Sequence, residues 1–306
     1  MRNEVVVSAP AKVNLSLGVG QVRRDGYHPL ATVYQAIGLY DEVTVRTSGS
    51  SEHRLSVVGD AVDVSDVPTG STNLALKAAT LLAARHGIDE GVEMVIRKRI
   101  PVAGGLAGGS TDAAAALVGC DALWETRTPR VELHAMAGKL GSDVPFCLDG
   151  GTAIGSGRGE VVAPAMARGR YWWVVATSTE GLSTAEVYRE FDRMHGDRQV
   201  PEPTIPDELM SALRSGDVEK LGLALTNDLQ AAALRCRPEL ERLLTSGLEN
   251  SAHGALLAGS GPTCLFLAES EAHAAQLDEA LRQDVDVARD TLLFAQAPVP
   301  GARVIR

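Results

Sequence analysis

The chain has 306 residues, of which 45% are hydrophobic and 22% are charged, and its formal net charge at pH 7 is −10. This length allows two domains, and the composition is that of a globular protein with ample material for a core. The acidic balance argues against a general nucleic-acid-binding protein, which would present a basic surface. It does not exclude a site for a small anion, because a glycine-rich loop and one lysine can bind phosphate within an acidic protein.

The cysteines and the N-terminal segment bear on the cellular compartment. Cys120, Cys147, Cys236 and Cys264 lie far apart and form no C-x-x-C pair, so they indicate neither a zinc site nor a disulfide framework. They are expected to be small buried side chains in a reducing compartment. Residues 1–18 lack the uninterrupted apolar segment of a signal peptide, and no run approaches the about 18 apolar residues of a membrane span. We therefore expect a cytoplasmic protein without membrane contact.

Alternating and helical patterns follow one another through the first half of the chain. Strands are expected at residues 5–7, 13–17, 32–39, 41–47 and 91–100. Residues 26–29 are expected to form a turn, and Gly59-Asp60 is a candidate hairpin turn between mixed sequences. Helices are expected at residues 74–86, 112–123 and 131–140, the first of them capped by Asn73 and closed by Gly87.

A glycine-rich stretch from Gly150 to Gly159 leads into the second half. Strands are expected there at residues 171–176, 255–257, 264–268 and near 290–297, and helices at 207–215, 217–233, 238–247 and 270–283. A proline-rich loop occupies residues 196–206, and a second glycine turn, AGSGPT, occupies residues 258–263. Strands and helices are interleaved without a regular repeat, which predicts an α+β protein. We divide it into domains at residues 1–160 and 161–306.

The segment PVAGGLAGGSTDAAAAL, residues 101–117, is the clearest candidate for a binding site. Its glycines let the backbone approach a ligand closely, and the serine, threonine, aspartate and alanines that follow favour a helix start. Such a loop directs backbone N–H groups at an anion, usually a phosphate. It matches neither Walker A, since no lysine follows Gly109, nor G-x-G-x-x-G. The alternative is a flexible loop before an ordinary helix.

Two charged residues in other segments complement this loop. Lys12 lies in an alternating strand, so it is expected to face an anionic partner or ligand, unless it is an exposed lysine of an edge strand. Asp143 follows a predicted helix, where its charge would oppose the helix dipole, and Val144 before Pro145 is expected to be extended. The alternative for Asp143 is a structural Asx turn.

A lysine, an aspartate and a phosphate-binding loop together suit phosphoryl transfer. That reaction requires mainly positioning and charge stabilisation, with a group that accepts the proton of the attacking hydroxyl. In this hypothesis the loop holds the β- and γ-phosphates. Lys12 offsets the developing charge and keeps Asp143 ionised, and Asp143 accepts the proton.

The segments PAKVNLSL, PVAGGLAGGSTDAAAAL and AGSGPTCLF resemble, in this order, the three motifs of the GHMP kinases. The resemblance implies a ribosomal-S5-like N-terminal domain and a ferredoxin-like C-terminal domain. The further segments RDGYHPL and GSDVPF resemble one branch of the family. That branch uses ATP and Mg²⁺ to phosphorylate the 2-hydroxyl of a CDP-linked methylerythritol, on the non-mevalonate route to isoprenoid precursors. The alternatives are a GHMP kinase for homoserine or a mevalonate derivative, and a nucleotide- or RNA-binding module that has lost catalysis.

The resemblance also implies a role for each matched residue. Lys12 and Asp143 match the catalytic pair. Tyr27 and Tyr188 match aromatic residues that enclose cytosine, although phenylalanine is common at the second position, and His28 matches the hydrogen-bonding partner of the base. The predicted substrate-binding residues are Asn14, Tyr27, His28, Thr184 and Tyr188. The predicted ATP-binding residues are Asn73, Pro101, Val102, Ala103, Gly104, Gly105, Leu106, Ala107, Gly108, Gly109, Ser110 and Thr111.

The sequence does not determine the metal ligands or the oligomeric state. Ser110 and Asp112 are each compatible with a structural role or with a place near the metal, so no Mg²⁺ ligand is assigned. Either a monomer or a homodimer is compatible with the sequence. The remaining histidines have no ligand-like spacing and are expected at the surface or in the core: His53, His86, His134, His195, His253 and His273.

Overall fold

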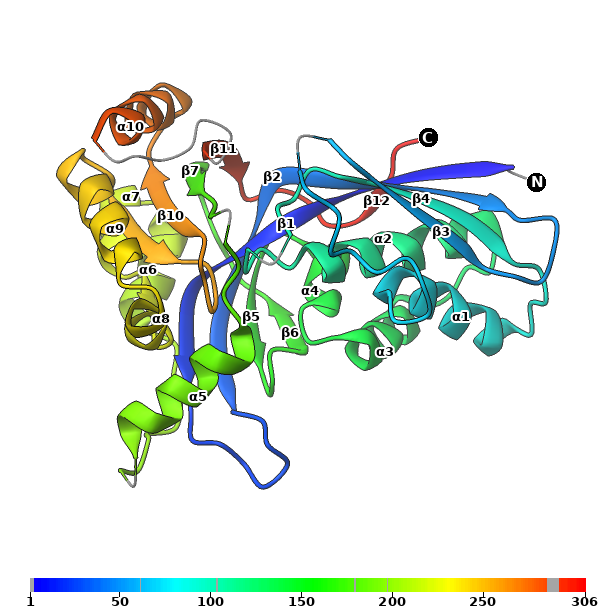
Figure 1. The fold of residues 1–306 in the computed structure, drawn as a ribbon, viewed down its shortest axis with the longest axis horizontal. Helices are drawn as coiled ribbons and strands as arrows, with labels where there is room; N and C mark the ends of the chain where they lie inside the picture. Colours follow the sequence, from blue (N-terminus) through cyan, green and yellow to red (C-terminus); the bar gives the residue numbers. More distant parts are fainter. Residues whose placement is uncertain (1–2, 61, 103, 179, 197, 285–291) are drawn as a thin grey trace.

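A long antiparallel hairpin, made of β1 (Glu4–Val19) and β2 (Leu30–Thr47), runs from the N-terminal end of the molecule to its other end (Figure 1). The computed structural model describes residues 3–60, 62–102, 104–178, 180–196, 198–284 and 292–306. The separate strands predicted at residues 5–7 and 13–17 are parts of β1. The register of the hairpin shifts between Pro10 and Ala11 and again between Asn14 and Ser16, so two irregularities flank Lys12.

The hairpin is the centre of the larger sheet. Its strand order is β12 (Arg303–Val304), β1, β2, β4 (Val92–Lys98) and β3 (Arg54–Gly59). β5 (Thr152–Ser156) pairs with β2, β6 (Val161–Pro164) pairs with β5, and β8 (Thr226–Asn227) pairs with β1. β3 lies within the sequence for which only mixed structure was expected. It runs parallel to β4 up to Gly59, so the predicted hairpin turn at that residue is wrong.

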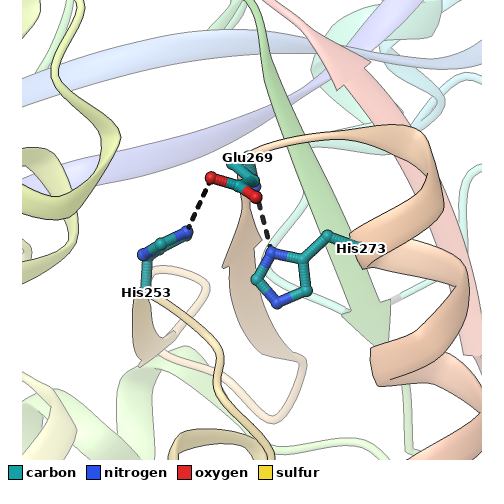
Figure 2. Close-up of side chains that lie close together, drawn as sticks. All are labelled: His253, Glu269 and His273. Carbon is teal, nitrogen blue, oxygen red and sulfur yellow. Dashed lines mark hydrogen bonds and ion pairs between the residues drawn. The ribbon is translucent and has the colours of Figure 1, made fainter.

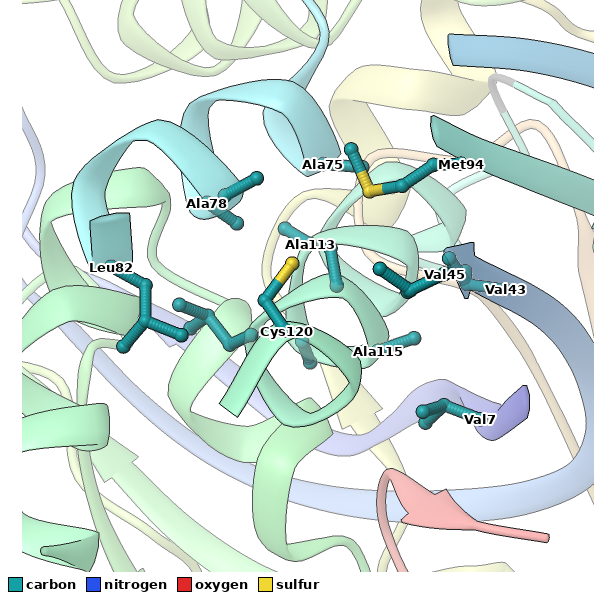
Figure 3. Close-up of a cluster of buried hydrophobic side chains, with 14 of the residues drawn as sticks. Val7, Val43, Val45, Ala75, Ala78, Leu82, Met94, Ala113, Ala115 and Cys120 are labelled. Carbon is teal, nitrogen blue, oxygen red and sulfur yellow. The ribbon is translucent and has the colours of Figure 1, made fainter. Parts of the chain in front are cut away.

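Four helices cover one face of this sheet (Figure 1). They are α1 (Leu74–His86), α2 (Gly108–Leu123), α3 (Arg130–Leu140) and α4 (Val144–Asp149). The predicted caps of α1 are confirmed, because the side chain of Asn73 accepts from the N–H of Ala75 and Gly87 is left-handed. Figure 3 shows alanines of α1 and α2 in one buried cluster with valines of β1 and β2. Small side chains let the two helices pack closely on the sheet, which holds the start of α2 in a fixed place.

Two helix starts differ from the sequence prediction. α2 begins at Gly108 rather than residue 112, because Ala107 takes a left-handed conformation and its carbonyl accepts the N–H of Thr111. α4 was not predicted, and Val144 is its first residue instead of an extended one. Proline is tolerated in a first helical turn, where its missing N–H has no partner to lose. Asp143 therefore follows α3, as expected, and also directly precedes the N-terminus of α4, where a negative charge is favourable.

The smaller sheet has the strand order β11 (Leu292–Ala297), β7 (Tyr171–Ala176), β10 (Cys264–Ala268) and β9 (Gly254–Leu257), and it is antiparallel throughout. One face, which includes Trp173 and Leu265, shares a core with β1 and β2. Phe266 on the other face packs among helical residues. The surrounding helices are α5 (Thr184–His195), α6 (Asp207–Ser215), α7 (Val218–Leu223), α8 (Gln230–Cys236), α9 (Glu239–Glu249) and α10 (Glu271–Asp284). Both faces of the sheet are therefore buried.

The second half also differs from prediction in its helices, and α5 was not predicted. The stretch expected to be helical at residues 217–233 contains α7 and α8, with β8 between them. The predicted boundary at residue 160 lies in the turn between β5 and β6, and β12 returns from the C-terminus to the larger sheet. The division into residues 1–160 and 161–306 stays a prediction.

The helices and mixed sheets confirm the predicted α+β class. All four cysteines are free, and three of them are buried while Cys236 is half-buried. Within the described ranges, none of the helices combines the length and apolar composition needed to cross a bilayer.

Candidate functional site

A cleft of about 990 Å³ collects the segments that the sequence marks as functional. It is lined by residues of β1, the loop after β4, the start of α5 and the glycine turn after β9. Nearly every predicted site residue that the structure describes lines this cleft, and Thr111 is the exception. Ala103, also predicted to bind ATP, lies outside the described residues. Segments far apart in the sequence therefore form one cavity.

Thr111 is fully buried below the cleft. Its hydroxyl donates to the carbonyl of Pro10 at 2.9 Å, and its N–H donates to the carbonyl of Ala107. Both donors are occupied by the protein, so the structure gives no support to the predicted ATP contact of Thr111. Its contact with Pro10 instead ties the first turn of α2 to β1.

Lys12 and Asp143 meet at the wall of the cleft. The Nζ atom of Lys12 lies 3.5 Å from the Oδ2 atom of Asp143, and the lysine side chain is buried while the aspartate is partly open. Lys12 also donates to the Oδ1 atom of Asn14 at 2.8 Å. A buried ammonium needs such partners, and their number here fixes its position. The structure thus places the two predicted catalytic groups side by side.

Asn14 is itself held in a chain of buried hydrogen bonds. Its Nδ2 atom donates to the hydroxyl of Thr32 at 2.8 Å, and that hydroxyl donates to the carbonyl of Ser16 at 2.6 Å. The order of donors requires the amide oxygen of Asn14 to face Lys12. The ammonium of Lys12 is therefore positioned through the hairpin that carries it.

The glycine loop rests on the second glycine turn. The N–H of Lys12 donates to the carbonyl of Leu106 at 3.2 Å, which joins the loop to β1. Gly105 has a φ of +76°, and a Cβ atom there would lie 2.1 Å from the carbonyl oxygen of Ala258. Only glycine fits this contact. The three segments that resemble family motifs therefore touch one another directly.

We expect Gly105→Ala to lower the free energy of unfolding by more than about 2 kcal/mol. A left-handed backbone costs an alanine about 1–2 kcal/mol, and the contact with Ala258 adds to that. Chemical denaturation measures the change. Gly138→Ala is the matched control, because Gly138 lies in α3 with open space around its Cβ position, and it should be neutral or slightly stabilising. Equal stability of the two variants would show that the loop does not need this close approach.

Asn73 marks another wall of the cleft. Its Oδ1 atom caps α1 through the N–H of Ala75, and its Nδ2 atom donates to the carbonyl of Pro68 at 2.7 Å. Asp66 and Val67 of the same loop also line the cleft. The start of α1 and the loop before it therefore form one fixed wall.

The turn after β1 and the helix α5 form the opposite part of the site. His28 is buried, its Nε2 atom lies 2.9 Å from the Oδ1 atom of Asp192, and its ring centroid lies 4.8 Å from that of Tyr188. Tyr27 is 52% exposed, and the guanidinium of Arg158 lies 4.8 Å from its ring centroid. The predicted aromatic residues thus lie at one end of the cleft, with one ring accessible.

Some residues at this end were not predicted from the sequence. Thr184, Tyr188 and Asp192 follow one another at four-residue spacing on α5, so they share a helix face and all line the cleft. That spacing could have identified Asp192. The hydroxyls of Thr184 and Ser260 are hydrogen-bonded at 2.9 Å, which joins α5 to the second glycine turn. Arg158 has no comparable signal in the sequence.

The two tyrosines nearest Asp143 remain phenols at neutral pH. Burial raises the pKa of Tyr188 to about 12, and the charge of Asp143 adds to this effect. Burial and Asp143 likewise raise the pKa of Tyr34 well above its usual value, and the Lys12 ammonium lies 5.7 Å from that ring. Neither phenol is therefore ionised to act as a base for this site.

A buried ionic cluster supports the glycine loop and was also missed. Lys98, at the end of β4, is ion-paired with Asp41 and, at 2.9 Å, with Asp112 in the second turn of α2. Asp41 also accepts the N–H groups of Arg99 and Ile100. The cluster therefore joins both ends of the loop. The sequence showed a basic end to this strand but not the distant aspartates that neutralise it.

Asp112 keeps one oxygen available in this cluster. Its Oδ1 atom is buried and has no hydrogen-bond partner among the described residues, while Asp112 and Lys98 both line the cleft. Burial raises the pKa of Asp112 to about 8, with Asp41 acting in the same direction and Lys98 opposing it. A buried carboxylate oxygen without a donor is suited to a further cation or a water molecule.

Comparison with known proteins agrees with this geometry. The family model "GHMP kinases N terminal domain" matches residues 73–151, and the model "GHMP kinases C terminal" matches residues 209–286. A 4-diphosphocytidyl-2-C-methyl-D-erythritol kinase of Thermobifida fusca is 53% identical, over 98% of this chain and 98% of that protein. The protein of the same name from a Nocardioides species is 52% identical, over 97% and 98%.

Solved structures show the same relationship. A crystal structure of 4-(cytidine 5'-diphospho)-2C-methyl-D-erythritol kinase has a TM-score of 0.77 and 32% identity, over 97% of this chain and 99% of that one. A homoserine kinase from Cytophaga hutchinsonii has a TM-score of 0.76 at 18% identity, over 100% and 98%, and shares the fold. The chain belongs to the GHMP kinase family and, within it, to the 4-diphosphocytidyl-2-C-methyl-D-erythritol kinases.

Proposed function

We propose that this protein transfers the γ-phosphate of ATP to the 2-hydroxyl of 4-diphosphocytidyl-2-C-methyl-D-erythritol. The observation that carries the proposal is the pair Lys12–Asp143, separated by 3.5 Å at the wall of the cleft. The glycine loop lies beside this pair, and aromatic residues lie at one end of the same cavity. The relatives of about 50% identity over nearly the whole chain carry the name of this activity.

In the proposed reaction Asp143 accepts the proton of the substrate hydroxyl. Its partly open carboxylate lines the cleft, and the adjacent ammonium of Lys12 stabilises the charge that develops on the phosphoryl oxygens. The backbone N–H groups of residues 104–110 and the start of α2 bind the phosphates of ATP. Asn73 and the loop before α1 form the wall at which we place adenine. The protein contributes positioning and charge, as phosphoryl transfer requires.

Mg²⁺ fits the oxygen donors of this cleft. Ser110, Asp112 and Asp143 line it, and the unpartnered buried oxygen of Asp112 is the kind of ligand that Mg²⁺ prefers. We propose these residues as the group that holds the ion. When bound, Mg²⁺ neutralises charge on the β- and γ-phosphates.

Substrate recognition is proposed for the end of the cleft near α5. Tyr27 offers an accessible ring and Tyr188 a second aromatic face, while His28 is held by Asp192 for a contact with the base. Thr184 and Asn14 contribute polar groups to the same cavity. A cytosine ring has the flat faces that such aromatic residues bind.

We expect Tyr27→Ala to raise the KM for the cytidine substrate about tenfold, since stacking on one base contributes about 1–3 kcal/mol. The ring is half-exposed and lies beneath Arg158, so its loss leaves the core intact. kcat and the KM for ATP should change little, because stacking is uniform binding. Steady-state kinetics with each substrate varied in turn measures this. Tyr27→Phe keeps the ring and is the control. An equal rise in the KM for ATP would show that Tyr27 does not serve the cytidine substrate specifically.

One assay separates this proposal from its alternatives. The protein is incubated with ATP and Mg²⁺ and with each of the cytidine substrate, homoserine and mevalonate, and ADP release is followed. Turnover with the cytidine substrate is the expected result. Turnover with homoserine or mevalonate instead would overturn the substrate assignment. If no ADP is released with any of the three alcohols, a nucleotide-binding module is favoured.

The proposed setting is the cytoplasm, in keeping with four free cysteines, three of them buried. A monomer and a homodimer both remain compatible with the described structure.

A further inference from the structure

Two of the histidines expected at the surface or in the core lie together with a carboxylate in the smaller-sheet half of the molecule. Figure 2 shows His253, directly before β9, Glu269, directly after β10, and His273, in the first turn of α10, around a common point. One ligand atom of each residue lies within 4.8 Å of the other two. None of the three lines the kinase cleft. No ligand-like spacing in the sequence marks this cluster, because the pairing of β9 with β10 brings His253 to the other two residues.

The backbone around this cluster is fixed. The N–H of His253 donates to the carbonyl of Leu267 at 2.9 Å, which continues the pairing of β9 with β10. The N–H of His273 donates to the hydroxyl of Ser270 at 3.1 Å, which caps the start of α10. The three side chains therefore project from anchored positions, and small side-chain rotations are sufficient to change the distances between them.

The nitrogen atoms of the two histidines have incomplete hydrogen bonding. The Nε2 atom of His253 is buried and has no hydrogen-bond partner among the described residues, although it lies 3.7 Å from the Oε2 atom of Glu269. The Nδ1 atom of His273 accepts only a long bond of 3.4 Å from the N–H of Glu269. A buried imidazole nitrogen without a partner is costly, so a ligand at this point would relieve it.

We propose that His253, Glu269 and His273 bind a divalent transition-metal ion of the Zn²⁺ class. Two imidazoles and one carboxylate are a recognised zinc donor set. At metal–ligand distances of about 2.0–2.2 Å, two ligands of a tetrahedral ion are about 3.4 Å apart, close to the 3.7 Å between His253 and Glu269. Mg²⁺ is disfavoured because it prefers an all-oxygen environment.

The position of the site determines what the ion would do. Glu269 is 61% exposed, so an ion can enter from solvent and keep a water molecule as its fourth ligand. The ion would cross-link β9, β10 and α10, which are otherwise joined by packing and by the sheet. Because it binds the folded state alone, it would stabilise that state without taking part in phosphoryl transfer.

The test consists of two titrations of the metal-free full-length protein. Binding of Zn²⁺ is measured by calorimetry, and binding of Co²⁺ is measured by visible absorption. We expect one equivalent to bind, an absorption band of a four-coordinate Co²⁺ ion, and a higher Tm in the presence of Zn²⁺. His253→Ala, His273→Ala and Glu269→Gln should each weaken Zn²⁺ binding at least about tenfold. Glu269→Gln changes an exposed side chain, so its folding is the least affected.

His134→Ala is the matched control. His134 forms a 2.9 Å pair with Asp149 but belongs to no group of three metal-ligating side chains in the described part of the chain, so its loss should leave Zn²⁺ affinity unchanged. The melting temperature of each variant without metal separates an effect on folding from one on binding. Affinity for Zn²⁺ that is equal in the unaltered protein and in Glu269→Gln and His273→Ala would overturn the proposal, as would Co²⁺ binding without the four-coordinate band. Both readouts are independent of kinase turnover.

Discussion

Asp143→Asn should lower kcat by about 10²–10⁴-fold, the contribution expected of a general base. Asparagine keeps the shape of the side chain but cannot accept the proton of the substrate hydroxyl. Binding of ATP should change little, because the loop and the start of α2 provide the phosphate contacts. ADP release measures kcat, and calorimetry with a non-hydrolysable ATP analogue measures binding.

Asp217→Asn provides the control for that experiment. Asp217 also pairs with a lysine, Lys220 at 2.8 Å, and precedes a short helix, but it lies outside the cleft. Asparagine also caps helices well, so this variant should retain stability and kcat. An unchanged kcat in Asp143→Asn would remove Asp143 from the mechanism.

Lys12→Met should reduce kcat by about 10²–10³-fold, as expected when a preorganised charge is removed from a transition state. Methionine keeps the apolar stem in the buried wall, but Asn14 and Asp143 lose their cation. The double variant with Asp143→Asn should be hardly slower than the slower single variant, because the two residues act as a unit. Steady-state ADP release of the three variants provides the comparison.

Lys77→Ala is the control for the lysine, since Lys77 is exposed on α1, and its kcat should be unchanged. Independent, multiplicative losses in the double variant would contradict the paired action of Lys12 and Asp143. Loss of the folded state, detected by circular dichroism, would identify a structural effect of the substitution instead.

The sequence was informative where a feature is local. Alternation predicted most of β1 and β2, and Asn73 and Gly87 predicted both ends of α1, because strand faces and helix caps depend on neighbouring residues. α4 was missed since six residues carry little periodicity, and Pro145 suggested an extended chain. The start of α2 at Gly108 was missed because the residue before it, Ala107, caps the helix with a left-handed backbone and without a side-chain hydrogen bond.

Long-range pairing explains what the sequence did not predict at the site. The motifs predicted that Lys12 and Asp143 act together, and in the structure their side chains are ion-paired. Asp41, Lys98 and Asp112 lie on three different elements, β2, β4 and α2, which the fold brings together. No local sequence pattern therefore predicts the ion pairs of Lys98 with the two aspartates. His253 reaches Glu269 only because β9 pairs with β10.

The β1–β2 hairpin carries groups for both proposed tasks of the cleft. Lys12 lies within β1, and the turn with Tyr27 and His28 joins β1 to β2. The two strands are paired with each other from Glu4 to Val19, so the lysine and the aromatic turn belong to one connected unit. A substitution that displaces this hairpin should therefore impair phosphoryl transfer and binding of the cytidine substrate together.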